Sequence, residues 1–303
     1  MTESTHAGRL PLGVTAVMLP ELDFDEQVAL CAELGVTHYV YRPRVISEAH
    51  RSQPYSNWGN HRFDLTPERL LKEGPALTEQ LQAAGLIAYG TVPNITAASP
   101  EAEQKLNFEA AAAAGAGTVR LTPVPYPQEG LSDYAAYLDG AVRAYEQSIG
   151  WAKSFGVKPV VEMHAGNAAI GPGLAMNLVK HFLPEDIGLI VDLPNFAREG
   201  GVRPNLCLSV VRDYVDHCHF GGFRRTPQGF DAYGYKRPGG EICSLAESDE
   251  PIPLWVSLLA ELGEVPLVIE DYTDGMPGAL RLRRSVAEAR RLPEVRQALG
   301  SRV

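Results

Sequence analysis

A chain of 303 residues is long enough for one (β/α)8 barrel, which takes about 250 residues, or for two medium domains. Its formal net charge of −10 at pH 7 argues against a general nucleic-acid binder, because phosphate contact requires clustered lysine and arginine. Residues 1–10 lack the apolar core of a signal peptide, and no apolar run predicts a transmembrane helix. The four cysteines form no CxxC pair, as is typical of reduced thiols. We therefore expect a cytoplasmic protein with no nucleic-acid or membrane partner.

One structural unit recurs along the chain: an amphipathic helix ends in glycine and runs directly into a short segment rich in Val and Ile. Glycine after the last helical turn accepts the left-handed conformation that caps a helix. The segments that follow lack strict alternation, as expected of strands buried on both faces. The full unit is seen at residues 31–41, 81–90, 111–122, 152–162 and 259–270, and further strands are predicted at 12–19, 188–192 and 217–223.

Eight strands that alternate with helices form either a closed parallel barrel or a doubly wound sheet. No GxGxxG motif follows the first strand, which disfavours the dinucleotide-binding sheet. We therefore predict an α/β fold, a single-domain (β/α)8 TIM barrel over residues 10–303 with a tail at 1–9. Capping hydroxyls before a proline predict helix starts at Thr66-Pro67 and Ser99-Pro100.

Polar side chains stand at the C-terminal ends of the four late strands, each after several apolar residues. These ends converge on one mouth of a barrel, where buried carboxylates must share a cation or take up protons. The donors Glu162, Asp192, His219 and Glu270 suit one divalent ion, Mn²⁺ first, with Mg²⁺, Co²⁺ or Zn²⁺ as alternatives. Any one of these residues alone would equally fit a helix cap or a salt bridge, so the complete set carries the prediction. His217, deeper in its strand, is interpreted as a core histidine.

This set resembles the xylose isomerase-like TIM-barrel superfamily, which includes sugar-phosphate isomerases and epimerases, keto-sugar epimerases and dehydratases. The resemblance covers nearly the whole chain in strand order and is strongest after residue 160. It implies that Glu162, Asp192, His219 and Glu270 hold the metal. It also implies that Arg225, six residues after the metal-binding histidine, contacts substrate oxygens, and that the glycine-rich stretch 238–242 follows it.

Two departures from the common epimerase pattern bear on the reaction. Asn195 stands where many epimerases have a histidine three residues after the strand-six Asp, and an amide cannot shuttle protons near neutral pH. Glu162 and His164 lie two residues apart on one face of a strand, about 6.6 Å along it. This arrangement resembles the dehydratase-type and C-glycoside-cleaving members, in which a histidine near the metal acts as a base.

The predicted chemistry is enolisation of a keto-sugar or sugar-like substrate. The metal polarises the carbonyl as a Lewis acid, His164, Glu162 or Glu270 removes the α-proton, and Arg225 helps to hold the enolate. β-Elimination, as in a dehydratase or a C-glycoside deglycosidase catalytic subunit, is favoured over isomerisation or 3-epimerisation of a ketose or sugar phosphate.

The sequence also allows other interpretations of the function and of some site residues. A non-catalytic barrel subunit is the second alternative, and an apurinic-site endonuclease of the same superfamily is disfavoured by the acidic charge. Trp58 and His61, in the loop 55–63, would stack on and hydrogen-bond a sugar, or belong to a packed surface loop. The expected partners are a sugar or glycoside substrate, and either a second copy of the chain or a small partner subunit.

Overall fold

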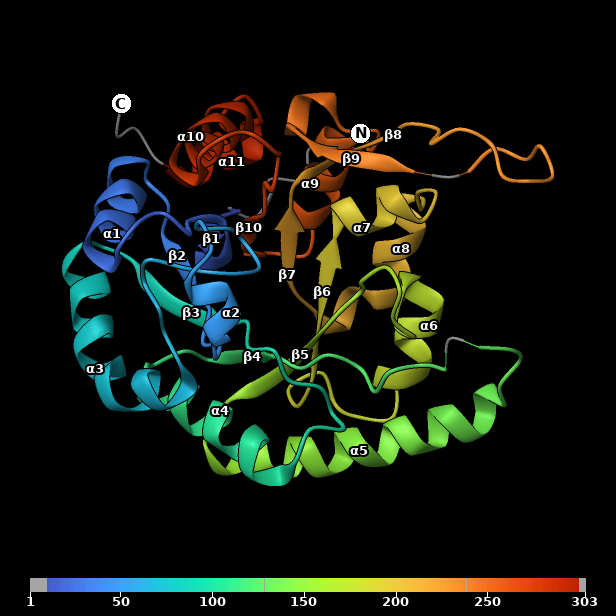
Figure 1. The fold of residues 1–303 in the computed structure, drawn as a ribbon, viewed down its shortest axis with the longest axis horizontal. Helices are drawn as coiled ribbons and strands as arrows, with labels where there is room; N and C mark the ends of the chain where they lie inside the picture. The colour runs from blue at the N-terminus through green and yellow to red at the C-terminus, as the bar shows by residue number, and fades with distance from the viewer. Residues whose placement is uncertain (1–9, 128, 238, 300–303) are drawn as a thin grey trace, which may run out of the picture.

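The computed structural model describes residues 10–127, 129–237 and 239–299. Within these ranges eight parallel strands form a closed barrel in the order β1-β10-β7-β6-β5-β4-β3-β2, which confirms the predicted (β/α)8 fold (Figure 1). The tail predicted at residues 1–9 lies outside the described residues. The barrel strands are β1 (Leu12–Thr15), β2 (His38–Tyr41), β3 (Ile87–Thr91), β4 (Thr118–Arg120), β5 (Lys158–Glu162), β6 (Gly188–Asp192), β7 (Val215–Phe220) and β10 (Leu267–Ile269).

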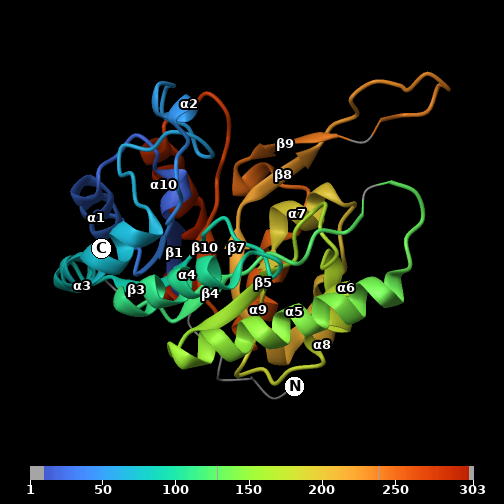
Figure 2. The same ribbon diagram turned by 60° about the horizontal axis from the view of Figure 1, so that its bottom comes forward.

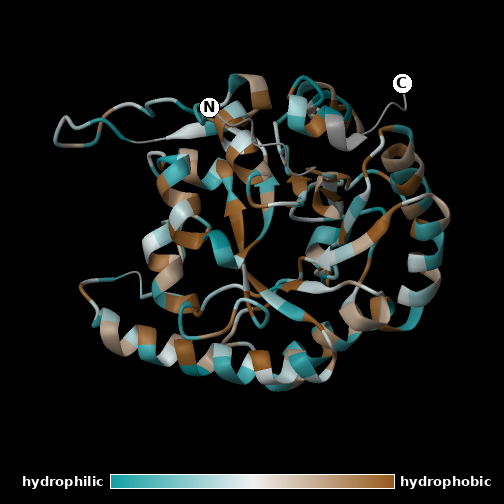
Figure 3. Cartoon of the chain, turned by 180° about the vertical axis from the view of Figure 1, so that it is seen from behind, coloured by the Kyte–Doolittle hydropathy of each residue, from teal (hydrophilic) through white to brown (hydrophobic). Residues whose placement is uncertain are grey.

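Helices form a ring outside the strands, which buries both faces of the barrel sheet (Figure 1). In Figure 3 the strands and the helices both carry hydrophobic and hydrophilic residues, as a helix between core and water requires. None of the described helices is long and apolar enough to cross a membrane. The helices are α1 (Phe24–Glu33), α2 (Glu48–Arg51), α3 (Pro67–Ala83), α4 (Glu101–Ala113), α5 (Tyr134–Ser154), α6 (Gly171–Val179), α7 (Leu193–Arg198), α8 (Pro204–Val211), α9 (Ile252–Ala260), α10 (Gly278–Ala289) and α11 (Pro293–Leu299).

The helix ends follow the predicted chemistry with one exception. Gly35 and Gly156, which follow α1 and α5, have φ of 64° and 70°, the left-handed conformation expected of a capping glycine. The hydroxyl of Thr66 accepts a hydrogen bond from the Arg69 N–H at 3.2 Å and caps α3. The predicted cap at Ser99 is wrong. Pro100 occupies the cap position of α4, because the Ser99 hydroxyl is used by the Thr96 N–H of the preceding turn at 3.1 Å.

A small polar network lies inside the barrel, below the strand ends. His217 is buried and donates from Nδ1 to Oδ1 of Asp216 at 2.9 Å. The same carboxylate accepts from the Tyr89 hydroxyl at 2.7 Å and pairs with Lys158 Nζ at 2.7 Å. His217 is therefore the hydrogen-bonded core histidine that its depth in the strand predicts.

Long segments after β2 and β7 cover the C-terminal ends of the strands. After β7 the chain forms an antiparallel hairpin of β8 (Gly222–Arg225) and β9 (Gly240–Cys243), which packs beside α7. Residues 226–237 between them project away from the barrel in both views (Figures 1 and 2). Both segments therefore begin at the mouth where the barrel strands end.

Candidate metal centre

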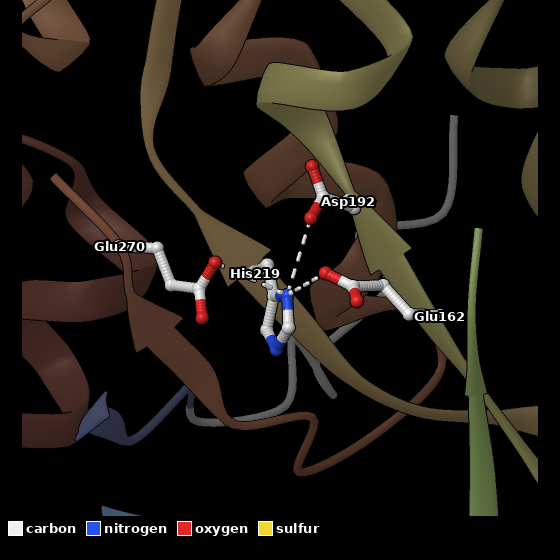
Figure 4. Close-up of side chains that lie close together, drawn as sticks. All are labelled: Glu162, Asp192, His219 and Glu270. Atoms are coloured by element: carbon white, nitrogen blue, oxygen red, sulfur yellow. Dashed lines mark hydrogen bonds and ion pairs between the residues drawn. The ribbon is translucent and has the colours of Figure 1, made fainter. Parts of the chain in front are cut away.

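The four predicted ligands meet at the mouth of the barrel. Glu162 and Asp192 are the last residues of β5 and β6, His219 lies in β7, and Glu270 directly follows β10. The parallel register sets Asp192 beside His219, and His219 beside Val268 of β10. One donor atom from each side chain lies within 4.8 Å of the others, and all four side chains point toward one centre (Figure 4).

A single imidazole nitrogen faces all three carboxylates of this cluster. Nδ1 of His219 lies 2.9 Å from Oε1 of Glu162, 3.1 Å from Oδ2 of Asp192 and 3.3 Å from Oε2 of Glu270. The four residues are at most 8% exposed. One N–H satisfies one acceptor well, so two of the three buried oxygens around it are underused by protein contacts alone.

The charge of the cluster fits one divalent cation. Arg120, at the end of β4, is the neighbouring cation, with Nη1 2.9 Å from Oε2 of Glu162. Three carboxylates, one guanidinium and a neutral imidazole leave two negative charges, which one M²⁺ ion would neutralise. Three carboxylates and one imidazole suit Mn²⁺, Mg²⁺, Co²⁺ or Zn²⁺. The residues therefore fit the predicted metal.

Burial and mutual repulsion shift the pKa values of these groups. Burial raises the pKa of Asp192, and it raises that of Glu270 to about 7. For Glu162 burial also acts upward, but Arg120 and His219 outweigh it and hold the pKa well below its usual range. Burial disfavours protonated His219, yet the carboxylates of Glu270 and Glu162 raise its pKa well above 6.5. A metal ion must therefore displace a proton from this cluster, so its affinity increases with pH.

A pocket of about 380 Å³ opens above the cluster. Among the predicted site residues, His164, Asn195 and Trp58 line this pocket together with three of the four ligand residues: Glu162, Asp192 and Glu270. Its wall also contains three polar residues that sequence reasoning did not identify, Arg120, Arg198 and Tyr272. The metal cluster thus forms the floor of a cavity that a small molecule can enter from the mouth.

Hydrogen bonds to the turn after β5 hold His164 and Asn195 in place. Nδ1 of His164 lies 2.5 Å from the Ala165 carbonyl oxygen, which only accepts, so Nδ1 carries the proton and Nε2 the lone pair. Oδ1 of Asn195 accepts from the Ala165 N–H at 3.1 Å. The Asn195 side chain therefore presents its NH2 group as a donor. The pocket is thus lined by one potential base and one fixed donor.

Two predicted substrate contacts lie elsewhere. Arg225 is on β8, where its N–H donates to Oδ2 of Asp249 at 2.6 Å, and it lines a neighbouring pocket on the hairpin side that shares Arg198 with the pocket above the cluster. His61 is buried outside the pocket lining, with Nε2 3.1 Å from the Asn57 carbonyl. Burial and the nearby charge of Arg42 lower the pKa of His61 to about 3. Pro238, the first residue of the predicted glycine-rich stretch, lies outside the described residues.

Two of the three missed residues carried a readable signal. Arg120 ends β4 directly after Val119, a strand-end position like those of the ligands on the later strands. Tyr272 follows Glu270 by two positions, the spacing that keeps side chains on one face of an extended chain. Burial and the carboxylates of Glu270 and Glu162 raise the pKa of Tyr272 well above 10, so its hydroxyl keeps its proton. Arg198 lies in the last turn of α7, which no strand-end rule reaches.

Comparison with known proteins gives a consistent picture of the fold. No protein-family model and no curated protein sequence matches the chain. Among solved structures, the "IOLI protein with a binding zinc atom" has a TM-score of 0.68 at 14% identity, with 95% of this chain and 99% of that chain covered.

Two further structures have this fold. A xylose isomerase-like TIM barrel protein from Mycobacterium smegmatis in complex with magnesium has a TM-score of 0.60 at 17% identity, covering 99% of this chain and 100% of that one. A sugar phosphate isomerase/epimerase from Parabacteroides distasonis has a TM-score of 0.62 at 12% identity, covering 97% and 98%. The chain has the fold of xylose isomerase-like TIM barrels, the class that its strand-end residues predicted.

Proposed function

We propose that this protein is a divalent-metal-dependent enzyme that removes the α-proton of a keto-sugar or sugar-like substrate. The observation that carries the proposal is the convergence of Glu162, Asp192, His219 and Glu270 on the floor of a pocket at the barrel mouth. Two solved structures of the same fold are described with a magnesium and a zinc ion, which supports a divalent metal here. We favour Mn²⁺, because an oxygen-rich donor set with one imidazole suits it.

The chain's own residues supply the remaining roles. A bound divalent ion would polarise a carbonyl oxygen as a Lewis acid. His164 accepts the α-proton at Nε2, since its Nδ1 is occupied by the Ala165 carbonyl. Asn195 donates its NH2 group to a substrate oxygen. Arg120 provides the positive charge beside the reacting centre, a role that its place in the pocket wall supports, while Arg225 lines the neighbouring pocket on the hairpin side.

Elimination is the favoured outcome after proton removal. Asn195 cannot return a proton to the substrate at neutral pH, whereas His164 can pass its proton to the departing group, which is a hydroxyl or alkoxyl oxygen in a carbon–oxygen lyase and an aryl carbon in a carbon–carbon lyase. The enzyme would then be a carbon–oxygen or carbon–carbon lyase, such as a dehydratase or a C-glycoside deglycosidase subunit. The pairing of Glu162 and His164 at the end of β5 supports this reading.

Isomerisation or epimerisation is the competing function, and one feature of the cluster favours it. Glu162 and Glu270 approach His219 from opposite sides (Figure 4). Two carboxylates on opposite sides of a bound sugar are suited to removing a proton from one face and returning it on the other. Some structures with this fold are named as a sugar phosphate isomerase/epimerase and a D-allulose 3-epimerase.

Reactions in D2O separate the two functions. The metal-loaded protein is incubated with a panel of keto-sugars, sugar phosphates and 3-keto-glycosides, and products are followed by NMR and mass spectrometry. A lyase releases a leaving group and forms an unsaturated product. Solvent deuterium in recovered sugar, without loss of a group, would identify an isomerase or epimerase and end the lyase proposal. No exchange and no product on the whole panel would count against enolisation itself.

A further inference from the structure

A second pocket lies beside the candidate metal centre and shares a wall with it. It has a volume of about 330 Å³ and is lined by residues of the segments that follow β2 and β3, among them Arg42, Arg44 and Asn94. Trp58 lines both this pocket and the one above the metal ligands. One elongated ligand can therefore contact both cavities.

Two arginines of this pocket lack an acidic partner. Arg42 is 5% exposed, yet among the described residues its guanidinium makes one hydrogen bond, from Nη2 to the Gly59 carbonyl at 3.3 Å, and its Nε has no partner. Arg44 donates from Nε to the Val92 carbonyl at 3.4 Å and lies 5.5 Å from the centre of the Trp58 ring. Neither forms an ion pair within the part of the chain that the structure describes.

Other arginines of the same loop are satisfied in the ordinary way. Arg62 pairs with Asp23 at 2.8 Å and Glu26 at 3.0 Å, and Arg51 pairs with Asp64. The contrast marks Arg42 and Arg44 as cations that form no ion pair within the described chain. A buried, unpaired guanidinium is costly, and the cost decreases when an anion binds to it.

The charges of the residues that line this pocket also favour the binding of an anion. Burial lowers the pKa of Arg42 to about 10 and that of Arg44 to about 9, values at which both stay charged at neutral pH. Glu103 also lines the pocket, but it is exposed and supplies one negative charge against two positive ones. Arg120 lowers the pKa of Arg44 and Glu270 raises it, so the arginines of this pocket lie close enough to the metal ligands to interact with them electrostatically.

We propose that Arg42 and Arg44 bind an anionic group of the substrate, a phosphate ester or a carboxylate, while its carbonyl end lies over the four metal ligands. The planar guanidinium suits either oxyanion, because it offers paired donors. The second half of this statement rests on the proposed function, whereas the anion site itself does not. The enzyme thus acts on an anionic sugar derivative rather than on a neutral sugar.

Anion binding is tested directly by calorimetry with inorganic phosphate and, separately, with acetate. Each is titrated into the full chain, both metal-loaded and stripped with EDTA, so that anions ligating the metal are recognised by their absence from the stripped form. The variants are Arg44→Met and Arg44→Lys, and Arg62→Met is the matched control because Arg62 is already paired with two carboxylates. Thermal unfolding of each variant confirms that it folds.

Phosphate or acetate should bind the stripped wild type at one site, with the tighter anion showing which group the substrate carries. Affinity should decrease at least about tenfold in Arg44→Met, less in Arg44→Lys, and stay unchanged in Arg62→Met. No binding of either anion to the stripped protein, or equal affinity in folded Arg44→Met, would overturn the inference. If anions bind but no substrate exchanges deuterium, the anion site stands and the proposed function fails. If neutral sugars react and no anion binds, the proposed function stands and the anion site fails.

Discussion

Nη1 of Arg120 lies 2.9 Å from Oε2 of Glu162, and the other oxygen of the same carboxylate lies 2.9 Å from Nδ1 of His219. Arg120 therefore orients one ligand and offsets part of the negative charge of the cluster. Since both partners are buried, the pair is not screened by solvent as a surface ion pair is.

Replacing Arg120 should destabilise the metal-free protein more than the metal-loaded protein. In Arg120→Met, the free energy of unfolding with EDTA should decrease by about 3 kcal/mol, because Glu162 loses its buried counter-charge. Adding Mn²⁺ should recover more stability in the variant than in the wild type, since the ion replaces the missing charge. Lys153→Met, which removes an exposed partner of Asp186, is the control and should change stability by less than about 1 kcal/mol. Equal stability of Arg120→Met and wild type in EDTA would contradict this account.

The backbone at Gly221, directly after β7, approaches Glu270, directly after β10, too closely to leave room for a side chain. A Cβ at Gly221 would lie 2.3 Å from the backbone oxygen of Glu270 and 2.9 Å from Cγ of Pro194, both fixed atoms. Gly221→Ala should therefore displace Glu270 and weaken metal binding at least about tenfold, measured by Mn²⁺ titration. Gly140→Ala, on α5 with open space around it, should leave metal affinity unchanged. Unchanged affinity in Gly221→Ala would show that Glu270 is not a ligand or that the strands yield freely.

His164 should be needed for proton removal but not for metal binding. His164→Gln keeps a hydrogen-bonding side chain near the Ala165 carbonyl and loses the base. The rate of solvent deuterium exchange into substrate should decrease by about 10² to 10⁴-fold, while metal content stays at the wild-type value. His181→Gln, an exposed histidine after α6, is the matched control. Loss of metal together with activity in His164→Gln would instead assign His164 to the metal site.

The buried His61 predicts a specific dependence of stability on pH. Its pKa is about 3 in the folded chain against 6.5 without the surrounding structure, so below pH 6.5 the unfolded state binds a proton that the folded state does not. Stability is therefore lost as the pH decreases from 6.5 toward 3, at about 1.4 kcal/mol per pH unit, or about 2 kcal/mol at pH 5.

Comparison of His61→Gln with wild type isolates this effect from the other histidines. The variant should be less stable than wild type at pH 7.5, but the difference should narrow by about 2 kcal/mol at pH 5 in denaturant unfolding. A constant difference between the two proteins across this range would show that His61 takes up its proton in the folded state.

The fold and the four ligands were predictable because both depend on local signals that recur. Glycine after five of the helices and the apolar segments that follow predict most of the strands, and the parallel barrel brings their C-terminal ends to one mouth. Glu162 and Glu270 lie far apart in the chain, yet the strand-end rule alone places them together.

Loop residues were not predictable by the same reasoning. Arg225 ends β8, a strand that leaves the barrel and pairs with β9, and Oδ2 of Asp249 accepts hydrogen bonds from its backbone N–H and its Nε. His61 is turned inward by its bond to the Asn57 carbonyl, although its aromatic, polar loop suggests exposure. Arg42 and Arg44 follow β2, but no pattern in the chain shows that they lack acidic partners, because partners are set by packing.

The central claim is that the four strand-end residues hold one divalent ion, and metal content measures it directly. Mass spectrometry on untagged wild type, Glu162→Gln and Asp192→Asn is compared with Asp271→Asn. The amide at position 192 can still accept the Asn195 N–H that caps α7, so this variant loses charge rather than the helix cap. Asp271 adjoins Glu270 but is bonded to Arg284 and Ser285 on the outer side. One ion per chain in wild type and Asp271→Asn, lost in the other two, is the predicted result. No ion in the wild type even after adding Mn²⁺, or full retention in Asp192→Asn, would contradict it.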